Sequence, residues 1–235
     1  MEKEFLEYRL PYIDSNMYLR IEGEEALAID PCPSEAVLDL LRERGVRQVT
    51  VLLTHEHFDH TSGVNWLRRH FACYVICQKA CGERISVPAN NRPLVFLPLM
   101  QAGSEEEAAE IEVFCESFPV ESIEADLTFG ETYDFLWRGH RLHLESCPGH
   151  SQGSVVIGFD STHVFTGDYM IPDTPVILRF PGGSKAAYRQ KTLPYLLSLP
   201  GRVQIMPGHG SPCLCRELHL EGGVFRLDRY GKKGA

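Results

Sequence analysis

The stretch VTVLLTHEHFDH, residues 49–60, decides the fold because it joins a continuous apolar run to five side chains that bind metals. The run from Val49 to Leu53 is typical of a strand buried on both faces of a sheet. The histidines and acidic residues therefore begin where a core strand ends, in a loop at the edge of the sheet. Their His-x-His-x-Asp-His spacing indicates a metal site.

The residues around this stretch predict further strands and helices. Residues 17–31, MYLRIEGEEALAIDP, have the pattern of two short strands joined by a turn near Gly23. Residues 34–45, SEAVLDLLRERG, predict an amphipathic helix that begins after a serine and ends at a glycine. With a helix after Ser62 and a strand at 72–78, the first half of the chain reads β-β-α-β-α-β.

The second half predicts strands whose ends carry further candidate ligands. The expected elements are hairpins over residues 130–150 and 154–168, a helix over 185–199 and a strand over 202–210. His150 follows the first hairpin, Asp168 ends the second and His209 ends the last strand. Most isolated histidines in loops do not bind a metal. These three residues and the opening motif all occupy strand ends, however, and residues far apart in sequence converge there to build a site.

The composition bounds the class of protein. A chain of 235 residues, 43% of them hydrophobic, can bury a substantial core in one large domain or two small ones. The formal net charge of −9 leaves no basic surface that would neutralise phosphates, so no nucleic-acid partner is expected. Neither a signal-peptide core nor a run of roughly 18 apolar residues is present, which predicts a cytoplasmic protein without a membrane partner.

The eight cysteines are expected to be mostly free thiols, as is usual in the cytoplasm. The spacing of Cys73, Cys77 and Cys81 raises the alternatives of an iron–sulfur cluster or a second zinc. We favour a structural role, because a strand spreads residues four apart over about 13 Å of backbone. Cys213 and Cys215 lie too close in sequence to form a tetrahedral site by themselves.

The segment 88–125 is the least regular part of the chain. It is rich in proline and includes a short acidic helix candidate around residues 104–111 and the apolar run LVFLPLM, residues 94–100. Connections of this length are uncommon unless they act as lids or binding loops. We expect a lid or a connector here, with the apolar run in a pocket wall or a homodimer contact.

Taken as a set, the motifs of this chain resemble those of the metallo-β-lactamase superfamily. The resemblance rests on Asp30, HEHFDH at 55–60, PGHS at 148–151, TGD at 166–168 and PGHG at 207–210. It implies a single domain over residues 1–235 with the α/β (α+β) fold of that family, an αββα sandwich of two mixed sheets flanked by helices. Within the superfamily, the C-terminal stretch is similar to small glyoxalase II-like hydrolases.

The resemblance also implies a dinuclear metal site. It places His55, His57 and His150 on the first metal, and Asp59, His60 and His209 on the second, with Asp168 bridging. Nitrogen and oxygen ligands suit zinc, so two Zn²⁺ ions are expected, although iron or manganese can occupy similar sets. Asp30 is interpreted as an acceptor that orients a ligand imidazole rather than as a ligand.

The metal pair predicts the chemistry. A water between two cations loses its proton near neutral pH and attacks a carbonyl that one metal polarises. We therefore predict a hydrolase that cleaves an ester, thioester, lactone or related acyl bond of a small molecule. Asp59 and Asp168 are the expected catalytic carboxylates. Tyr169 is a candidate donor to the oxyanion, although a packed aromatic is the simpler interpretation. Arg179 or Lys185 is expected to bind an anionic tail of the substrate.

Two alternatives remain at this point. One is a mononuclear iron oxidoreductase of the persulfide dioxygenase kind on the same scaffold. The other is a metal-binding module without catalytic activity. The sequence does not identify the acyl group, because the pocket walls come from loops whose shape the pattern does not predict.

Overall fold

The computed structural model describes residues 4–94, 100 and 104–228, and the chain divides into two compact units. Unit 1 is Met1–Phe129 and unit 2 is Gly130–Ala235. Each unit contains a six-stranded mixed β-sheet with its own helices, which confirms the predicted fold class of two mixed sheets and helices. The expectation of a single domain over 1–235 stays a prediction.

The sheet of unit 1 has the strand order β1-β2-β3-β4-β5-β6. The strands are β1 (Leu6–Arg9), β2 (Asn16–Glu22), β3 (Glu25–Ile29), β4 (Gln48–Leu52), β5 (Ala72–Gln78) and β6 (Leu127–Phe129). The first two pairs are antiparallel, whereas β3 to β6 are parallel. Since the carboxyl ends of parallel strands meet at one edge, the residues after β3 and β4 come together there.

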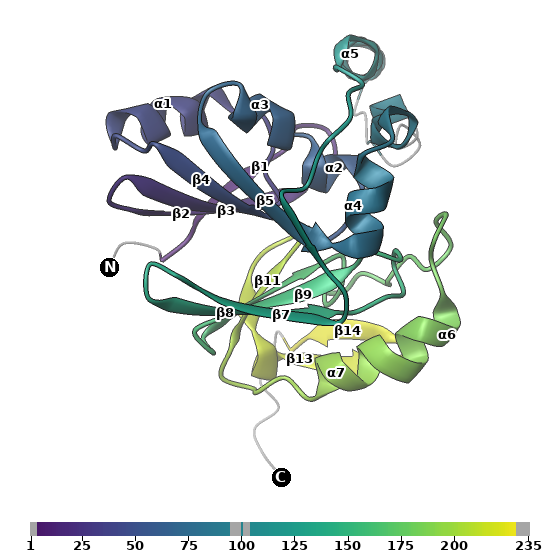
Figure 1. Ribbon diagram of the computed structural model, residues 1–235. Helices are drawn as coiled ribbons and strands as arrows, with labels where there is room; N and C mark the ends of the chain where they lie inside the picture. The colour runs from purple at the N-terminus through teal and green to yellow at the C-terminus, as the bar shows by residue number, and fades with distance from the viewer. Residues whose placement is uncertain (1–3, 95–99, 101–103, 229–235) are drawn as a thin grey trace. The chain divides into compact units, whose positions relative to one another are not determined.

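The helices of unit 1 are mostly short. They are α1 (Glu35–Glu43), α2 (Phe58–Thr61), α3 (Val64–Arg68), α4 (Lys79–Ile85), a 3₁₀ turn η1 (Pro88–Asn91) and α5 (Glu105–Ser117). Figure 1 shows α1 and α3 on one face of the sheet. Ser34 caps α1 as predicted, because its hydroxyl accepts from the Val37 amide at 3.4 Å. The acidic helix candidate is confirmed as the start of α5, capped by Ser104.

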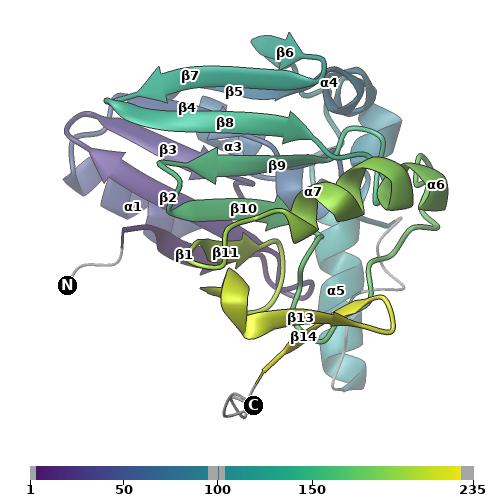
Figure 2. The same cartoon turned by 90° about the horizontal axis from the view of Figure 1, so that it is seen from below.

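The sheet of unit 2 has the order β12-β11-β10-β9-β8-β7. Its strands are β7 (Thr132–Trp137), β8 (His140–Ser146), β9 (Val155–Phe159), β10 (His163–Gly167), β11 (Gln204–Pro207) and β12 (Cys213–Leu214), followed by a 3₁₀ turn η4 (Cys215–Glu217) and the hairpin β13 (Leu218–Glu221)–β14 (Val224–Leu227). Figure 2 shows β7, β8, β9 and β10 side by side. Because β8, β10 and β11 run in the same direction, they end at the same edge of the sheet.

The predicted hairpins and helix of unit 2 are confirmed. Arg138 and Gly139 both have positive φ, 51° and 90°, as the two-residue turn between β7 and β8 requires. The helical run comprises α6 (Lys185–Ala187), η3 (Tyr188–Thr192) and α7 (Leu193–Leu197), and therefore ends two residues before the predicted Leu199. Neither β1 nor the hairpin β13–β14 was predicted, since four-residue strands carry too little periodicity.

The cysteines agree with a structural role. All eight are free thiols, and Cys77 and Cys81 are completely buried in the core of unit 1. Cys73 and Cys77 lie in β5, but Cys81 lies in α4, so the three do not share one strand.

Two further expectations concern the apolar run 94–100 and helices that could cross a membrane. The apolar run 94–100 falls mostly outside the described residues, which include only Leu94 and Met100 of it. Its role as a pocket wall or dimer contact stays a prediction. Among the residues that the structure describes, no helix combines the length and apolar character of a bilayer span.

Candidate metal centre

Each unit brings together its own set of candidate metal ligands and neighbouring polar residues at the carboxyl edge of its sheet. The first set lies in unit 1 and contains Asp30, Thr54, His55, His57, Asp59 and His60. The second set lies in unit 2 and contains His150, Asp168 and His209. All seven ligands implied by the family resemblance thus lie in one of two local sets.

Asp30 organises the first set from the end of β3. Its Oδ1 accepts from the Thr54 amide at 2.7 Å, and its Oδ2 accepts from the Thr54 hydroxyl at 2.5 Å. The same Oδ2 lies 2.8 Å from Nδ1 of His60. Three protein donors thus bond to a carboxylate that is only 3% exposed. This geometry is compatible with the expected orienting role of Asp30, which stays a prediction.

These hydrogen bonds select the tautomers of two histidines. His60 donates from Nδ1 to Asp30, so its Nε2 carries the lone pair. The hydroxyl of Thr54 uses its proton on Asp30 and therefore accepts from Nδ1 of His55 at 3.1 Å. His55 consequently also presents Nε2 as a lone pair. Thr54 was missed by the sequence analysis, since a threonine before a histidine carries no signal by itself.

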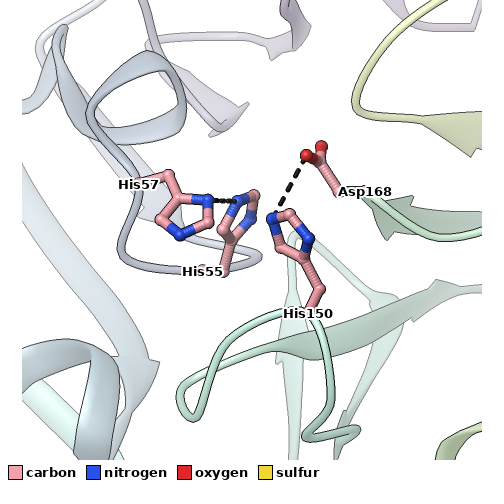
Figure 3. Close-up of side chains that lie close together, drawn as sticks. All are labelled: His55, His57, His150 and Asp168. Carbon is pink, nitrogen blue, oxygen red and sulfur yellow. Dashed lines mark hydrogen bonds and ion pairs between the residues drawn. The ribbon is translucent and has the colours of Figure 1, made fainter. Parts of the chain in front are cut away.

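The lone pair of His55 is directed at a second imidazole. Figure 3 shows its Nε2 next to Nδ1 of His57, and the two nitrogens are 3.0 Å apart. Further along the loop, Oδ2 of Asp59 lies 3.1 Å from Nε2 of His60. The first set thus offers two pairs of donor atoms, one of two nitrogens and one of a nitrogen and an oxygen.

A close backbone contact holds this loop against the end of β3. The Gly63 amide donates to the Pro31 carbonyl at 2.8 Å. A Cβ at position 63 would lie 2.6 Å from the carbonyl carbon and oxygen of Pro31, where no side chain fits. Because Pro31 follows Asp30 directly and Gly63 follows α2, this contact fixes the separation between the orienting carboxylate and His60.

In the second set, Asp168 lies between two histidines from different strand ends. Its Oδ2 is 3.2 Å from Nε2 of His150, the pair drawn in Figure 3. Its Oδ1 is 3.4 Å from Nε2 of His209. His150 donates from Nδ1 to the Ile177 carbonyl at 2.8 Å, which leaves its Nε2 as the lone pair. The two oxygens of this carboxylate therefore lie next to two different imidazole rings.

The hydroxyl of Tyr169 bonds to the backbone on two sides. It donates to the Cys147 carbonyl at 2.7 Å and accepts from the His150 amide at 2.8 Å. The side chain is only 1% exposed, and burial raises its pKa far above the ordinary value. This geometry favours the packed aromatic that the sequence analysis named as the simpler interpretation, and the role as a donor to the oxyanion stays a prediction.

The remaining sequence candidates lie outside both sets. Glu56 is buried, and its carboxylate lies 3.4 Å from the Arg84 guanidinium. Arg179 and Lys185 are exposed, and none of the ion pairs found in the described part of the chain includes them. Their role in binding a substrate stays a prediction.

The donor sets fit a metal in chemistry as well as in spacing. In unit 1, His55 and His57 place two ring nitrogens 3.0 Å apart, and Asp59 and His60 place an oxygen and a nitrogen 3.1 Å apart. Three histidines, His55, His60 and His150, are held in the tautomer that leaves Nε2 deprotonated, which is the form that binds a metal. Oxygen and imidazole ligands without thiolates are compatible with zinc, iron or manganese.

Comparison with known proteins gives a family and a set of related folds. A family model described as metallo-beta-lactamase superfamily matches residues 12–209. The chain is 26% identical over 193 residues to a hydroxyacylglutathione hydrolase of Halorhodospira halophila (strain DSM 244 / SL1). The match covers 80% of this chain but only 57% of that relative.

Two solved structures have similar folds. The BLEG-1 B3 metallo-beta-lactamase superposes with a TM-score of 0.69 at 23% identity, covering 90% of this chain and 94% of that one. At this identity the likeness concerns the fold alone. TTHA1623 in a di-iron-bound form gives a TM-score of 0.64 at 25% identity, covering 90% and 95% of the two chains.

Proposed function

Because the chain belongs to the metallo-beta-lactamase superfamily, whose model matches it from residue 12 to residue 209, we propose that it is a dinuclear metallo-hydrolase of acyl bonds. The proposed substrate is a small molecule with an ester, thioester or lactone. The proposed ligands are those implied by the family resemblance. The first metal takes His55, His57 and His150, the second takes Asp59, His60 and His209, and Asp168 is shared.

The observation that carries this proposal is the position of Asp168 between His150 and His209. A carboxylate that directs one oxygen at each of two imidazoles is the arrangement that a shared ligand of two metals needs. The family match from residue 12 to residue 209 includes every residue of the proposed ligand set.

When bound, the metal pair would acidify a water and polarise the substrate carbonyl. The protein's own residues prepare for this chemistry. Asp30 and Thr54 keep His55 and His60 in the required tautomers, and the Ile177 carbonyl does the same for His150. Tyr169 holds the His150 backbone in place through its hydroxyl.

For the substrate we propose a thioester with an anionic tail. The support is the hydroxyacylglutathione hydrolase relative, of which this chain spans 57%. Arg179 and Lys185 are exposed cations without an ion pair in the described part of the chain, which suits them to an anionic tail. The proposed metals are two zinc ions.

A second candidate is a mononuclear iron oxidoreductase, for which the related structure in a di-iron-bound form supports iron as the metal but not a single ion. Imidazole and carboxylate ligands also suit iron, and a single iron on the first-metal ligands would support oxidation rather than hydrolysis. This alternative shares the scaffold and the histidines with the main proposal. It differs in the identity and the number of metals.

The test is to purify the full chain without added metal, measure its metal content and assay it on a panel of thioesters, lactones and aryl esters. Two zinc ions per chain with acyl hydrolysis support the proposal. One iron per chain with thiol-dependent oxygen uptake supports the oxidoreductase. Full metal occupancy without turnover on any acyl substrate indicates a non-catalytic module, and either of the last two results contradicts the proposed hydrolase.

Single ligand substitutions test the assignment of ligands. His150→Ala should lower the occupancy of one metal and His209→Ala that of the other. His143→Ala is the matched control, since His143 lies on β8 of the same unit outside the proposed ligands. If His150→Ala and His209→Ala lose the same metal and keep the same one, the proposed division of ligands is wrong.

A further inference from the structure

Unit 1 contains a cavity of about 210 Å³ that none of the proposed metal ligands lines. One wall comes from α2 and α3, and the other from residues 118–123, which belong to the segment predicted as a lid or connector. A cavity of roughly 150 Å³ lined by apolar side chains is large enough to bind benzene. The volume therefore suits one aromatic ring with a small substituent.

Half of the apolar residues that line the cavity are aromatic. Phe58, Trp66 and Phe118 all line it. The Phe58 and Phe118 rings have their centroids 4.7 Å apart at 90°, the edge-to-face geometry that aromatic pairs prefer. Rings held in this way present both faces and edges to a further ring. The wall is therefore suited to an aromatic ligand rather than to a flexible chain.

Two polar residues of the lining have atoms without hydrogen-bond partners in the described part of the chain. Asn91 is 4% exposed, and its amide nitrogen donates to the Ile85 and Glu121 carbonyls at 2.6 and 2.8 Å. Its Oδ1 accepts nothing. Ser62 is 7% exposed, and its hydroxyl also has no partner. Buried acceptors normally have donors, so these atoms call for a donor that the described protein residues do not supply.

The rim adds no net charge. Arg69 and Glu121 form an ion pair of 2.6 Å there, and Asn65 also donates to the Glu121 carboxylate. An anionic or a cationic ligand would have to compete with this pair. A neutral ligand would leave it in place.

We propose that this cavity is a binding site for a small neutral aromatic molecule that carries a hydrogen-bond donor, such as a phenol. The ring packs against Phe58, Trp66 and Phe118, and the donor serves Asn91 or Ser62. This site is separate from the proposed metal centre and does not depend on the hydrolase activity.

The test uses phenol and toluene, which have the same size and differ in the donor. The chain has two tryptophans, so Trp137→Phe leaves Trp66 as the reporter inside the cavity. Phenol should change the Trp66 fluorescence saturably, with a Kd at least tenfold lower than that of toluene. No saturable change up to the solubility limit of phenol overturns the site, and equal Kd values for the two compounds overturn the role of the donor.

Variants that fill the cavity locate the binding. Ser62→Leu should weaken phenol binding more than tenfold, whereas Ser117→Leu, the same change at an exposed position of α5, should not. Equal Kd values in the two variants overturn the location. If Ser62→Leu does not fold, Ile123→Phe fills the cavity from the opposite wall and should weaken phenol binding more than tenfold.

Discussion

The two ligand sets offer the same kinds of ligand, but they differ in how the chain brings their residues together. In unit 1 the ligands are crowded into residues 55–60 of one loop, and Asp30 and Thr54 orient them through four hydrogen bonds. In unit 2 the ligands come from three separate strand ends, and Asp168 lies between His150 and His209. The first set is therefore held within one loop and the end of β3, whereas the second brings three strand ends together around Asp168.

The largest expected effect comes from removing that side chain. Asp168→Ala should abolish hydrolysis and weaken metal binding by at least about 100-fold, above the roughly 10- to 100-fold that outer-sphere changes cost. Metal titration and content measure it. Asp134→Ala, an exposed carboxylate of the same unit, is the matched control. Wild-type turnover with full metal content would show that the second set does not depend on Asp168.

A substitution at Gly63 tests whether the contact between Gly63 and Pro31 holds the loop of the first set in place. Gly63→Ala should lower the free energy of unfolding by about 3 kcal/mol, because the atoms in the way belong to the backbone and cannot turn aside. Urea unfolding measures the change. Gly130→Ala, where a Cβ meets nothing within 4 Å, should stay within about 0.5 kcal/mol of wild type. Equal midpoints in the two variants would contradict the strain at position 63.

Asp30→Asn tests whether the hydrogen bonds of Asp30 fix the tautomers of the histidines in the first set. An asparagine keeps one acceptor oxygen for three donors, so at least one of the hydrogen bonds to Thr54 and His60 is lost. Metal affinity should fall about 10- to 100-fold, and both metals should be affected, because Asp30 bonds to His60 directly and to His55 through Thr54. Asp39→Asn on the exposed face of α1 is the control. Unchanged affinity would mean that Asp30 does not orient His60.

Tyr169→Phe should give the smallest effect. It removes the hydroxyl that joins the Cys147 carbonyl to the His150 amide, at a cost of about 1 to 2 kcal/mol of unfolding free energy. Metal affinity should fall less than about tenfold. The positioning role predicts that kcat and metal affinity decline together. A large fall in kcat with unchanged stability and metal content would support the donor role that the sequence analysis considered.

The contrast between the sets also explains what the sequence could predict. The motif at residues 55–60 is local, so its spacing alone indicates a metal site. His150, Asp168 and His209 become candidates only because each follows a predicted strand. The relay from Asp30 through Thr54 to His55 depends on the parallel pairing of β3 with β4, which brings together residues about twenty-five apart. Hydrophobic patterns place these strands but do not give the direction of a hydroxyl proton.

The cavity in unit 1 could not be predicted for a related reason. Its walls combine α2, α3 and residues 118–123, which contact one another only through tertiary packing. The pattern of residues 88–125 predicted a lid or a connector but gave no shape. Asn91, which ties the Ile85 carbonyl to the Glu121 carbonyl, has no recognisable sequence signal.

The hydrogen bonds of Asp30 have a consequence for folding. The carboxylate is buried, and its oxygens take donors that the chain itself supplies from Thr54 and His60. Unit 1 also has a large apolar core, so its folding free energy does not have to come from a cation, in contrast to a zinc finger. A chelator should therefore strip the metals and lower the thermal unfolding midpoint by mass action, while the chain remains folded and ready to be reloaded.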